Sequence, residues 1–364
     1  MYLVFYLSRV QEAISLFLPA DTILENRYLI KDILGKGGMG AVYLAEDKRL
    51  GDRFLAVKEI CLHFNSEKDK EMALKQFRLE ATMLGKLDHP NLPKVIDYFG
   101  YNGKEYLVME YIQGKTLKDY IEERCSPFPV EQVIKWSLEI CSALEYLHEQ
   151  NPPIVFRDLK PQNIMINNNK QIKLIDFGIA KLFAPSTETD TFIHARGTMG
   201  YCPPEQCSLK GNTDIRSDIY ALGATMHYLL TNRNPSVLPF VFPPIKEILP
   251  EASEELEKIF SRALALDCDE RYGNIKELKE DLKKIISVSA VNTGLEAWIS
   301  KWWWTVALSV IFYGAGLIAL RSLLHELKPF LGYMFKPSSF LVLFIYLFIP
   351  IGGLIFYLRK NKKK

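Results

Sequence analysis

Six short motifs follow one another along this chain, and they constrain its fold more than any other feature. They are G-K-G-G-M-G at 35–40, A-V-K at 56–58, an acidic helix position at Glu80, F-R-D-L-K-P-Q-N at 156–163, D-F-G at 176–178 and P-P-E at 203–205. A single glycine-rich run or a single D-F-G arises by chance in many chains. Six motifs in one order do not, so we treat them as parts of one site.

In this order and spacing the chain resembles the bacterial eukaryotic-like (Hanks-type) Ser/Thr protein kinases over residues 28–285. The resemblance implies an α+β, bilobal protein kinase fold, with a β-rich N-terminal lobe and an α-rich C-terminal lobe. It also implies ATP and Mg²⁺ as cofactors and proteins with Ser or Thr hydroxyls as substrates.

Local sequence patterns agree with two lobes. β-Branched and aromatic residues between glycine and aspartate breaks predict strands at Tyr28–Leu34, Ala41–Ala45 and Phe54–Ile60. Apolar residues recur near helical spacing over 68–87. Beyond about residue 116 the pattern predicts helices at Val130–Glu149, Asp218–Leu230 and Glu254–Ala265.

The glycine-rich run lies in a strand–turn–strand context. Glycine is needed where backbone amides approach phosphates without an intervening Cβ. The run does not open a helix, as a dinucleotide-binding loop does. A glycine-rich hairpin that binds nothing is the alternative interpretation.

The resemblance assigns roles to charged residues of the later motifs. Lys58 is expected to hold the α- and β-phosphates and to pair with Glu80, whose alternative role is a surface contact. Asp158 is the expected catalytic base, and Lys160 steadies the γ-phosphate. Asn163 and Asp176 are the expected magnesium ligands, since carboxylate and amide oxygens suit this hard ion. A degenerate site is the alternative to all of these roles.

The nucleotide is expected to lie between the glycine-rich flap, the adenine walls and the hinge. Apolar walls with backbone hydrogen bonds are what a purine needs. Besides Lys58, Asn163 and Asp176, the expected contacts are Gly35, Lys36, Gly37, Gly38, Met39, Gly40, Val42, Ala56, Met109, Glu110, Ile112 and Met165.

Two positions depart from the family pattern. Phe156 replaces the histidine that usually precedes Arg-Asp, which keeps the packing and loses a polar contact. Pro203 stands in the motif that usually reads A-P-E, but Glu205 remains, and Arg271 resembles its usual ion-pair partner. Asp218 matches the aspartate that braces the catalytic loop.

The activation segment runs from Asp176 to Glu205. By resemblance, a phosphate on this segment meets Arg157, and the added charge orders the loop. We expect autophosphorylation within 187–191, although a plain solvated loop is the alternative. Thr198 resembles the threonine that contacts the catalytic Asp and Lys in Ser/Thr-specific kinases.

Beyond the kinase-like region the composition changes sharply. A mildly polar linker, 286–300, precedes two runs of nineteen residues without a charge, Trp302–Leu320 and Phe340–Leu358. As helices these runs reach about 29 Å, close to the ~30 Å hydrocarbon thickness of a bilayer. We expect transmembrane helices at 301–320 and 340–358, joined by a short extracytoplasmic loop at 321–339.

Charge sets the expected topology. The formal net charge is only +2, which gives no sign of a nucleic-acid partner, and the basic tail at 359–364 carries five positive charges. Basic flanks favour the cytoplasmic side, so the kinase domain and the tail are both expected there, at the cell membrane. Small residues in both spans, such as Gly314, allow close helix approach and therefore a homodimer.

The N-terminal extension, 1–27, begins with an apolar run that Arg9 interrupts. The run is too short to span a bilayer and lacks the charge order of a signal peptide. Packing on the kinase, lying on the membrane surface and disorder all remain open for residues 1–20.

The six cysteines carry no metal-ligand spacing, so a zinc site is not expected, and a reduced cytosolic setting suits them. Cys202 lies near the active-site segment, where an ordinary small side chain is favoured over a redox-sensitive one.

The leading interpretation is a membrane-anchored Ser/Thr protein kinase. A nucleotide-binding pseudokinase scaffold at the membrane is the alternative, with Phe156 as its support. A third interpretation gives the main function to the spans, but they lack the intramembrane charges that transport requires.

Overall fold

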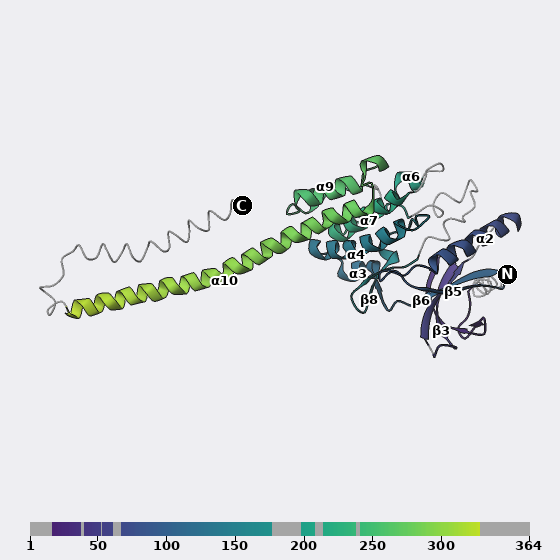
Figure 1. Ribbon diagram of the computed structural model, residues 1–364, viewed down its shortest axis with the longest axis horizontal. Helices are drawn as coiled ribbons and strands as arrows, with labels where there is room; N and C mark the ends of the chain where they lie inside the picture. The colour runs from purple at the N-terminus through teal and green to yellow at the C-terminus, as the bar shows by residue number, and fades with distance from the viewer. Residues whose placement is uncertain are drawn as a thin grey trace, which may run out of the picture. The chain divides into compact units, whose positions relative to one another are not determined.

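The computed structural model describes residues 17–37, 40–51, 53–60, 67–176, 198–207, 214–237 and 241–327. Several predicted features lie outside these residues: Gly38 and Met39, most of the activation segment, and the second predicted span. The chain divides into two compact units, Met1–Ser289 and Ala290–Lys364. The first unit holds the strand-rich lobe and the helical lobe that the sequence predicts (Figure 1).

The N-terminal lobe is a six-stranded antiparallel sheet with the order β1-β2-β3-β4-β6-β5. Its strands are β1 (Ile23–Leu24), β2 (Tyr28–Gly37), β3 (Gly40–Asp47), β4 (Arg53–Ile60), β5 (Val95–Tyr101) and β6 (Lys104–Glu110). The three strands predicted from the sequence are β2, β3 and β4, which are longer than expected by three, three and one residues.

Helix α2 (Glu67–Leu84) lies beside this sheet (Figure 1). Phe77, Ala81 and Leu84 are buried, at the spacing of one helix face. Ala56 and Ile60, which share one face of β4, belong to the same apolar cluster. The predicted helix at 68–87 is thereby confirmed, with its end three residues earlier.

The C-terminal lobe is mainly helical. Its helices are α3 (Leu117–Arg124), α4 (Val130–His148), α6 (Pro204–Cys207), α7 (Ile215–Thr231), α8 (Ile245–Ile248) and α9 (Glu254–Ala263). Short 3-10 turns are η1 (Pro161–Asn163) and η3 (Cys268–Glu270), and a small sheet pairs β7 (Gly114–Thr116), β8 (Ile164–Asn167) and β9 (Ile172–Leu174). The predicted helices correspond to α4, α7 and α9, within three residues at each end.

Helix α7 is the centre of this lobe. Fourteen of its residues are buried, so it has no polar stripe, as expected of a helix surrounded by protein. The Asp214 side chain caps its first turn, and Asn232, at φ 54°, ends it in the left-handed conformation. A Cβ on Gly223 would lie 3.1 Å from Leu264 and 3.2 Å from Ala263, so glycine permits the close approach of α9.

Helix α10 (Ile275–Leu327) includes the predicted linker and the first predicted span as one continuous helix. In the described part of the chain, one stretch is long and apolar enough to cross a membrane. It is Val306–Leu323, and none of it is buried by protein. This stretch overlaps the predicted span at 301–320.

Candidate active site

Three side chains contact the carboxylate of Asp158, the predicted catalytic base. Asn163 Nδ2 donates to Asp158 Oδ2 at 2.9 Å, and Lys160 Nζ lies 3.0 Å from the same oxygen. Thr198 Oγ1 donates to Asp158 Oδ1 at 3.3 Å and accepts from Lys160 Nζ at 2.6 Å. The Asp158 side chain is only 9% exposed. These contacts satisfy the buried carboxylate and hold it in one orientation.

Asp218, on α7, holds the backbone of the loop that carries Asp158. Its two oxygens accept from the backbone N–H groups of Phe156 and Arg157, each at 2.8 Å. His148 Nε2 lies 2.9 Å from Asp218 Oδ2, and the Asp218 side chain is fully buried. Buried carboxylates are costly unless they are hydrogen-bonded, so these contacts fix the loop conformation. The sequence predicts Asp218 as a brace, but it gives no sign of His148.

Phe156 occupies the place of the expected histidine without disturbing the loop. Its ring is 1% exposed and belongs to the main apolar cluster. The loop contact to Asp218 uses the backbone N–H of Phe156, which every non-proline residue carries. The departure from the family pattern therefore leaves the anchoring of the loop intact.

The two predicted magnesium ligands are close along the backbone. The N–H of Ile175 donates to the carbonyl of Asn163 at 2.8 Å, which brings Asp176 beside the asparagine. Both N–H donors of the Asn163 amide go to Asp158, to its carbonyl and to its carboxylate. The amide oxygen of Asn163 is thereby oriented as an acceptor. An amide oxygen and a carboxylate are a suitable donor pair for Mg²⁺.

Lys58 projects from β4 between Val42 of β3 and Leu107 of β6, its partners in the sheet register. Its Nζ contacts Asp176 Oδ1, so the predicted phosphate-binding cation and a predicted metal ligand meet. The backbone of Glu80 lies in α2, but its side chain is outside the described part of the chain. The Lys58–Glu80 pair therefore stays a prediction.

The glycine-rich flap joins β2 to β3. Gly37 pairs with Gly40 across the turn, and Gly40 has φ 133°, which favours glycine. A Cβ on Gly35 would meet nothing within 4 Å, so packing does not require glycine there. The expected close approach of phosphates to the backbone of Gly35 therefore stays a prediction.

The predicted adenine walls lie on neighbouring strands. Ala56 pairs with Met109 in the sheet register, and both are nearly buried, as is Ile112. Val42 packs against the same cluster, and Met165 lies on β8 in the other lobe. The upper and lower walls therefore come from separate lobes, as the sequence predicts.

Glu110, in the predicted hinge, forms contacts with residues next to β5 and in β9. Its backbone N–H donates to Lys94 O at 2.8 Å, and its carboxylate accepts from Lys94 N at 3.3 Å. The Lys173 ammonium lies 3.5 Å from the same carboxylate. The Glu110 side chain therefore ties the start of β5 to β9 of the helical lobe.

The predicted pair of Glu205 and Arg271 is present and bidentate. Its N–O distances are 2.6 and 2.9 Å, and Ser217 Oγ donates to the same carboxylate at 3.1 Å. Burial raises the pKa of Glu205, but the hydrogen bonds from Arg271 and Ser217 outweigh burial and lower it overall. The Arg271 side chain is fully buried. This pair fixes α6, which follows the activation segment, to the core of the lobe.

The expectation that all the cysteines are reduced is wrong at Cys202, which is disulfide-bonded. Cys125, Cys141 and Cys268 are free. Cys202 lies between Thr198 and Glu205, so the covalent bond acts on the stretch that enters α6. No disulfide is predictable from the sequence, because these cysteines follow no recognisable spacing.

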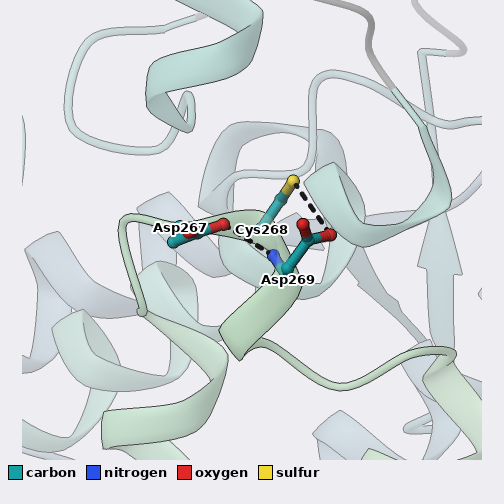
Figure 2. A group of neighbouring side chains, drawn as sticks. All are labelled: Asp267, Cys268 and Asp269. Atoms are coloured by element: carbon teal, nitrogen blue, oxygen red, sulfur yellow. Dashed lines mark hydrogen bonds between the residues drawn. The ribbon is translucent and has the colours of Figure 1, made fainter.

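Figure 2 shows the three neighbouring side chains of Asp267, Cys268 and Asp269. Asp267 caps η3 by accepting from the backbone N–H of Asp269 at 2.9 Å. The Asp269 carboxylate accepts from Arg216 at 2.7 Å. Both aspartates are exposed. Asp267 serves as a helix cap and Asp269 as half of a surface ion pair, so their contacts explain the cluster without a metal ion.

Comparisons with known proteins agree with this geometry. A family model described as protein kinase domain matches residues 28–288. The probable serine/threonine-protein kinase PknB of Lactococcus lactis is 35% identical over 273 residues, covering 71% of this chain and 42% of that protein. The serine/threonine-protein kinase PrkC of Bacillus subtilis is 35% identical over 280 residues, covering 74% of this chain and 42% of that protein. The chain spans less than half the length of these relatives.

Solved structures match about three quarters of the chain. The apo form of PpkA-294 is 29% identical, with a TM-score of 0.60 over 73% of this chain and 99% of that chain. The PknI kinase domain of Mycobacterium tuberculosis, at 23% identity and a TM-score of 0.59, shows the fold alone. With the family match over 28–288 and the catalytic-loop geometry, this chain belongs to the protein kinase domain family.

Proposed function

We propose that this chain is a membrane-anchored protein kinase that transfers the γ-phosphate of ATP to Ser or Thr hydroxyls of proteins. The observation that supports this most is the Asp158 carboxylate, which Lys160, Asn163 and Thr198 contact at 2.9–3.3 Å. A chain that only binds nucleotide has no need to orient a carboxylate in this way.

In the proposed reaction the substrate hydroxyl donates a hydrogen bond to Asp158. The hydroxyl oxygen forms a bond to the γ-phosphorus, the bond between that phosphorus and the ADP oxygen breaks, and the hydroxyl proton passes to Asp158. The transition state of such transfers is loose, so positioning contributes more than basicity. Lys160, beside the carboxylate, offers positive charge to the transferring phosphoryl oxygens.

The remaining predicted residues would bind the nucleotide. Asn163 and Asp176 would hold Mg²⁺, which supplies charge that neutralises the phosphate oxygens. Lys58 would contact the α- and β-phosphates from β4. Ala56 and Met165 would face the two sides of the adenine, one from each lobe.

The pseudokinase scaffold fits these contacts less well. Phe156 was the residue that favoured it. The burial of its ring and its backbone hydrogen bond to Asp218 argue against a loop that has lost its function.

The proposed test is the transfer of labelled γ-phosphate by the full chain in lipid nanodiscs to a generic basic protein, with an Asp158→Ala variant alongside. We expect label on Ser and Thr that is lost in the variant. Asp267→Asn, at the exposed acidic residue that caps η3, is the matched control and should transfer normally. Nucleotide binding without label in the unmodified chain would favour the scaffold instead.

Anchoring in the membrane is part of the proposal. It rests on the exposed apolar stretch Val306–Leu323 and on the second uncharged run, which lies outside the described residues. Exposed apolar surface of this extent marks an interaction site or a membrane segment. The full chain should stay with membranes after alkaline extraction, and the basic tail should be labelled only from the cytoplasmic side. Release by alkali would contradict anchoring.

A homodimer through the spans remains part of the same proposal. A Cβ on Gly314 or Gly316 would meet nothing within 4 Å, which leaves room for a second helix. Crosslinking in nanodiscs should give dimers that Gly316→Leu reduces. An unchanged dimer yield would argue against this face.

Regulation is proposed through phosphorylation of Thr187, Thr189 and Thr191, which lie outside the described residues. Arg157, next to the catalytic base, is the proposed phosphate partner. Phosphate-affinity electrophoresis should show a slower-migrating ladder that a triple Thr→Ala variant at these positions loses. Ser186→Ala is the neighbouring control, and an unchanged ladder in the triple variant would contradict the proposal.

A further inference from the structure

The sheet of the N-terminal lobe is covered on both faces. One face packs against α2 through residues such as Ala56 and Ile60. On the opposite face Tyr43, Val57 and Val108 neighbour one another across β3, β4 and β6, and each is 0% exposed. Antiparallel sheets commonly leave one face to water. The outer face of this sheet instead forms a second apolar cluster.

The strands cannot bury this outer face by themselves. Side chains on one face of a sheet stand side by side, so full burial needs a second layer about 10 Å above it. Among the described residues, every member of the outer cluster lies in strands β1 to β6 except Phe17 and Leu18. These two residues are the direct continuation of the N-terminal segment 1–16. The chain that precedes Phe17 and Leu18 is therefore in position to form the second layer over this face.

The N-terminal segment has the sequence of such a layer. Its apolar residues recur as a stripe with helical spacing at Leu3, Leu7, Val10, Ile14 and Phe17. Polar residues fall on the other side of that helix, at Ser8, Gln11, Glu12 and Ser15. A helix of sixteen residues is about 24 Å long, and a six-stranded sheet is about 24 Å wide.

A buried charged group on the outer face also indicates that this face is shielded from water. The Glu59 side chain is 0% exposed, and Lys104 Nζ contacts it at 2.7 Å. The hydroxyls of Tyr43 and Tyr106 donate to the same carboxylate at 3.2 and 3.0 Å. A carboxylate with these partners is tolerated inside a protein. The arrangement would be unnecessary on a face open to water.

The residues that follow the segment, Phe17 and Leu18, contact the strands that carry the glycine-rich flap. Leu18 N–H donates to the Tyr43 hydroxyl at 3.1 Å, which links the segment to the Glu59 group. The Lys36 ammonium lies 4.9 Å from the centroid of the Phe17 ring. Lys36 stands between Gly35 and Gly37, in the strand that carries the flap. A segment held at Phe17 therefore acts on the flap directly.

We propose that residues 1–16 form an amphipathic helix that docks its apolar stripe on the outer face of the N-terminal sheet and, through Phe17 and Lys36, holds the flap over the nucleotide. The occupant of this face is then the chain's own N-terminal segment. The second half of the inference rests on the proposed nucleotide-binding function, whereas the docking does not.

Photocrosslinking of the full chain in nanodiscs tests the docking. With Leu7→p-benzoylphenylalanine, we expect crosslinks within the chain to peptides from 40–60. The same replacement at Gln11, on the polar side, should give none there. Crosslinks from Leu7 to lipid would assign the segment to the membrane surface, and crosslinks to another chain would assign it to a dimer. Either result, or equal crosslinking from both positions, would overturn the proposal.

Affinity for a fluorescent ATP analogue with Mg²⁺ tests the effect on the flap. We expect the double variant Leu7→Asp, Val10→Asp to bind about tenfold more weakly, a change of about 1.4 kcal/mol. The matched control Ser8→Asp, Gln11→Asp adds the same charge on the polar side and should bind normally. Hydrogen exchange in β3 and β4 should quicken in the first variant alone.

A single, less disruptive substitution keeps the proposal testable if the double variant Leu7→Asp, Val10→Asp fails to fold. Phe17→Leu retains an apolar side chain but removes the ring beneath Lys36. We expect a two- to fivefold loss of analogue affinity, about the worth of an exposed cation–π contact. Unchanged affinity in this variant would overturn the link to the flap. If analogue binding responds as expected but no phosphate is ever transferred, the proposed catalytic function fails while the docking stands.

Discussion

The two lobes place their parts of the site by different means. In the helical lobe, charged side chains inside the protein fix the parts of the site: Asp218 holds the loop of Asp158 and Arg271 holds helix α6, and both side chains are fully buried. In the strand-rich lobe, Lys58 and the flap are placed by backbone pairing between strands. A substitution among the buried charged residues of the helical lobe should therefore change catalysis and stability together. A substitution among the paired strands of the other lobe should mainly change nucleotide binding.

The sharpest contrast is expected between Asp158→Asn and Lys58→Met. Asp158→Asn keeps the shape of the side chain but removes the acceptor for the hydroxyl proton, so kcat should fall about 10²- to 10⁴-fold. Its affinity for an ATP analogue should be unchanged. Lys58→Met should instead weaken nucleotide binding. Steady-state kinetics with calorimetric binding of the analogue distinguish the two, and a large loss of analogue affinity in Asp158→Asn would break the comparison.

The second largest effect is expected at Arg271. Arg271→Met leaves the Glu205 carboxylate without its bidentate partner and should lower the free energy of unfolding by about 3–5 kcal/mol, as breaking buried pairs does. Urea unfolding at pH 7 measures this. Arg262→Met, at a surface pair with Glu277, is the control and should change stability by less than about 1 kcal/mol.

The same pair predicts a pH dependence. The pKa of Glu205 is lowered from 4.5 in the folded protein, where the hydrogen bonds from Arg271 and Ser217 outweigh burial. The stabilisation is therefore fully present above pH 4.5 and is lost as the pH falls through the lower folded pKa. The difference in stability between the unmodified chain and Arg271→Met should shrink below pH 4.5. A difference that grows on acidification would contradict the assignment.

A smaller effect is expected at Asp218. Asp218→Asn offers one acceptor oxygen in place of two, so the N–H of either Phe156 or Arg157 loses its partner. An unsatisfied buried donor costs about 1–3 kcal/mol, and kcat should fall with stability. Thermal unfolding and kinetics measured on one preparation test this, with Asp269→Asn at the surface as control. A stable variant with normal kcat would show that the brace is not needed.

Effects no larger than that at Asp218 are expected at two glycines, one in each lobe. A Cβ on Gly223 would meet Leu264 at 3.1 Å, so Gly223→Ala should lower stability by about 1–3 kcal/mol through overpacking. A Cβ on Gly35 would meet nothing within 4 Å, so Gly35→Ala should keep stability and raise KM for ATP. Chemical unfolding and KM are the measurements. The opposite assignment of effects would contradict the contrast between the lobes.

Much of the site is predictable because short motifs place its residues. Asp158 and Asn163 are five positions apart, and the single turn η1 brings them into contact. Glu205 and Arg271 lie far apart in the sequence, yet each follows a pattern whose partner is expected, and the bidentate pair confirms it. Local pattern likewise predicts the strands β2, β3 and β4 and the helices α2, α4, α7 and α9, with errors of up to three residues at their ends.

Other contacts depend on the tertiary structure alone. His148 meets Asp218 across seventy positions, and no local pattern distinguishes it from another helix-terminal histidine. The burial of Glu59 depends on a covered outer face, which strand alternation does not reveal. The bond at Cys202 has no spacing signature. The contacts of His148 and Glu59 are made between segments that come together only in the folded chain.

The most direct test of the account is single-turnover transfer from bound ATP to a Ser peptide and to the same peptide with Tyr in its place. The contacts of Lys160 and Thr198 around Asp158 predict rapid transfer to Ser and transfer at least about 100-fold slower to Tyr, because the positioned site suits a short hydroxyl side chain. Bound ATP with no transfer to the Ser peptide, or equal transfer to both peptides, would contradict the central claim.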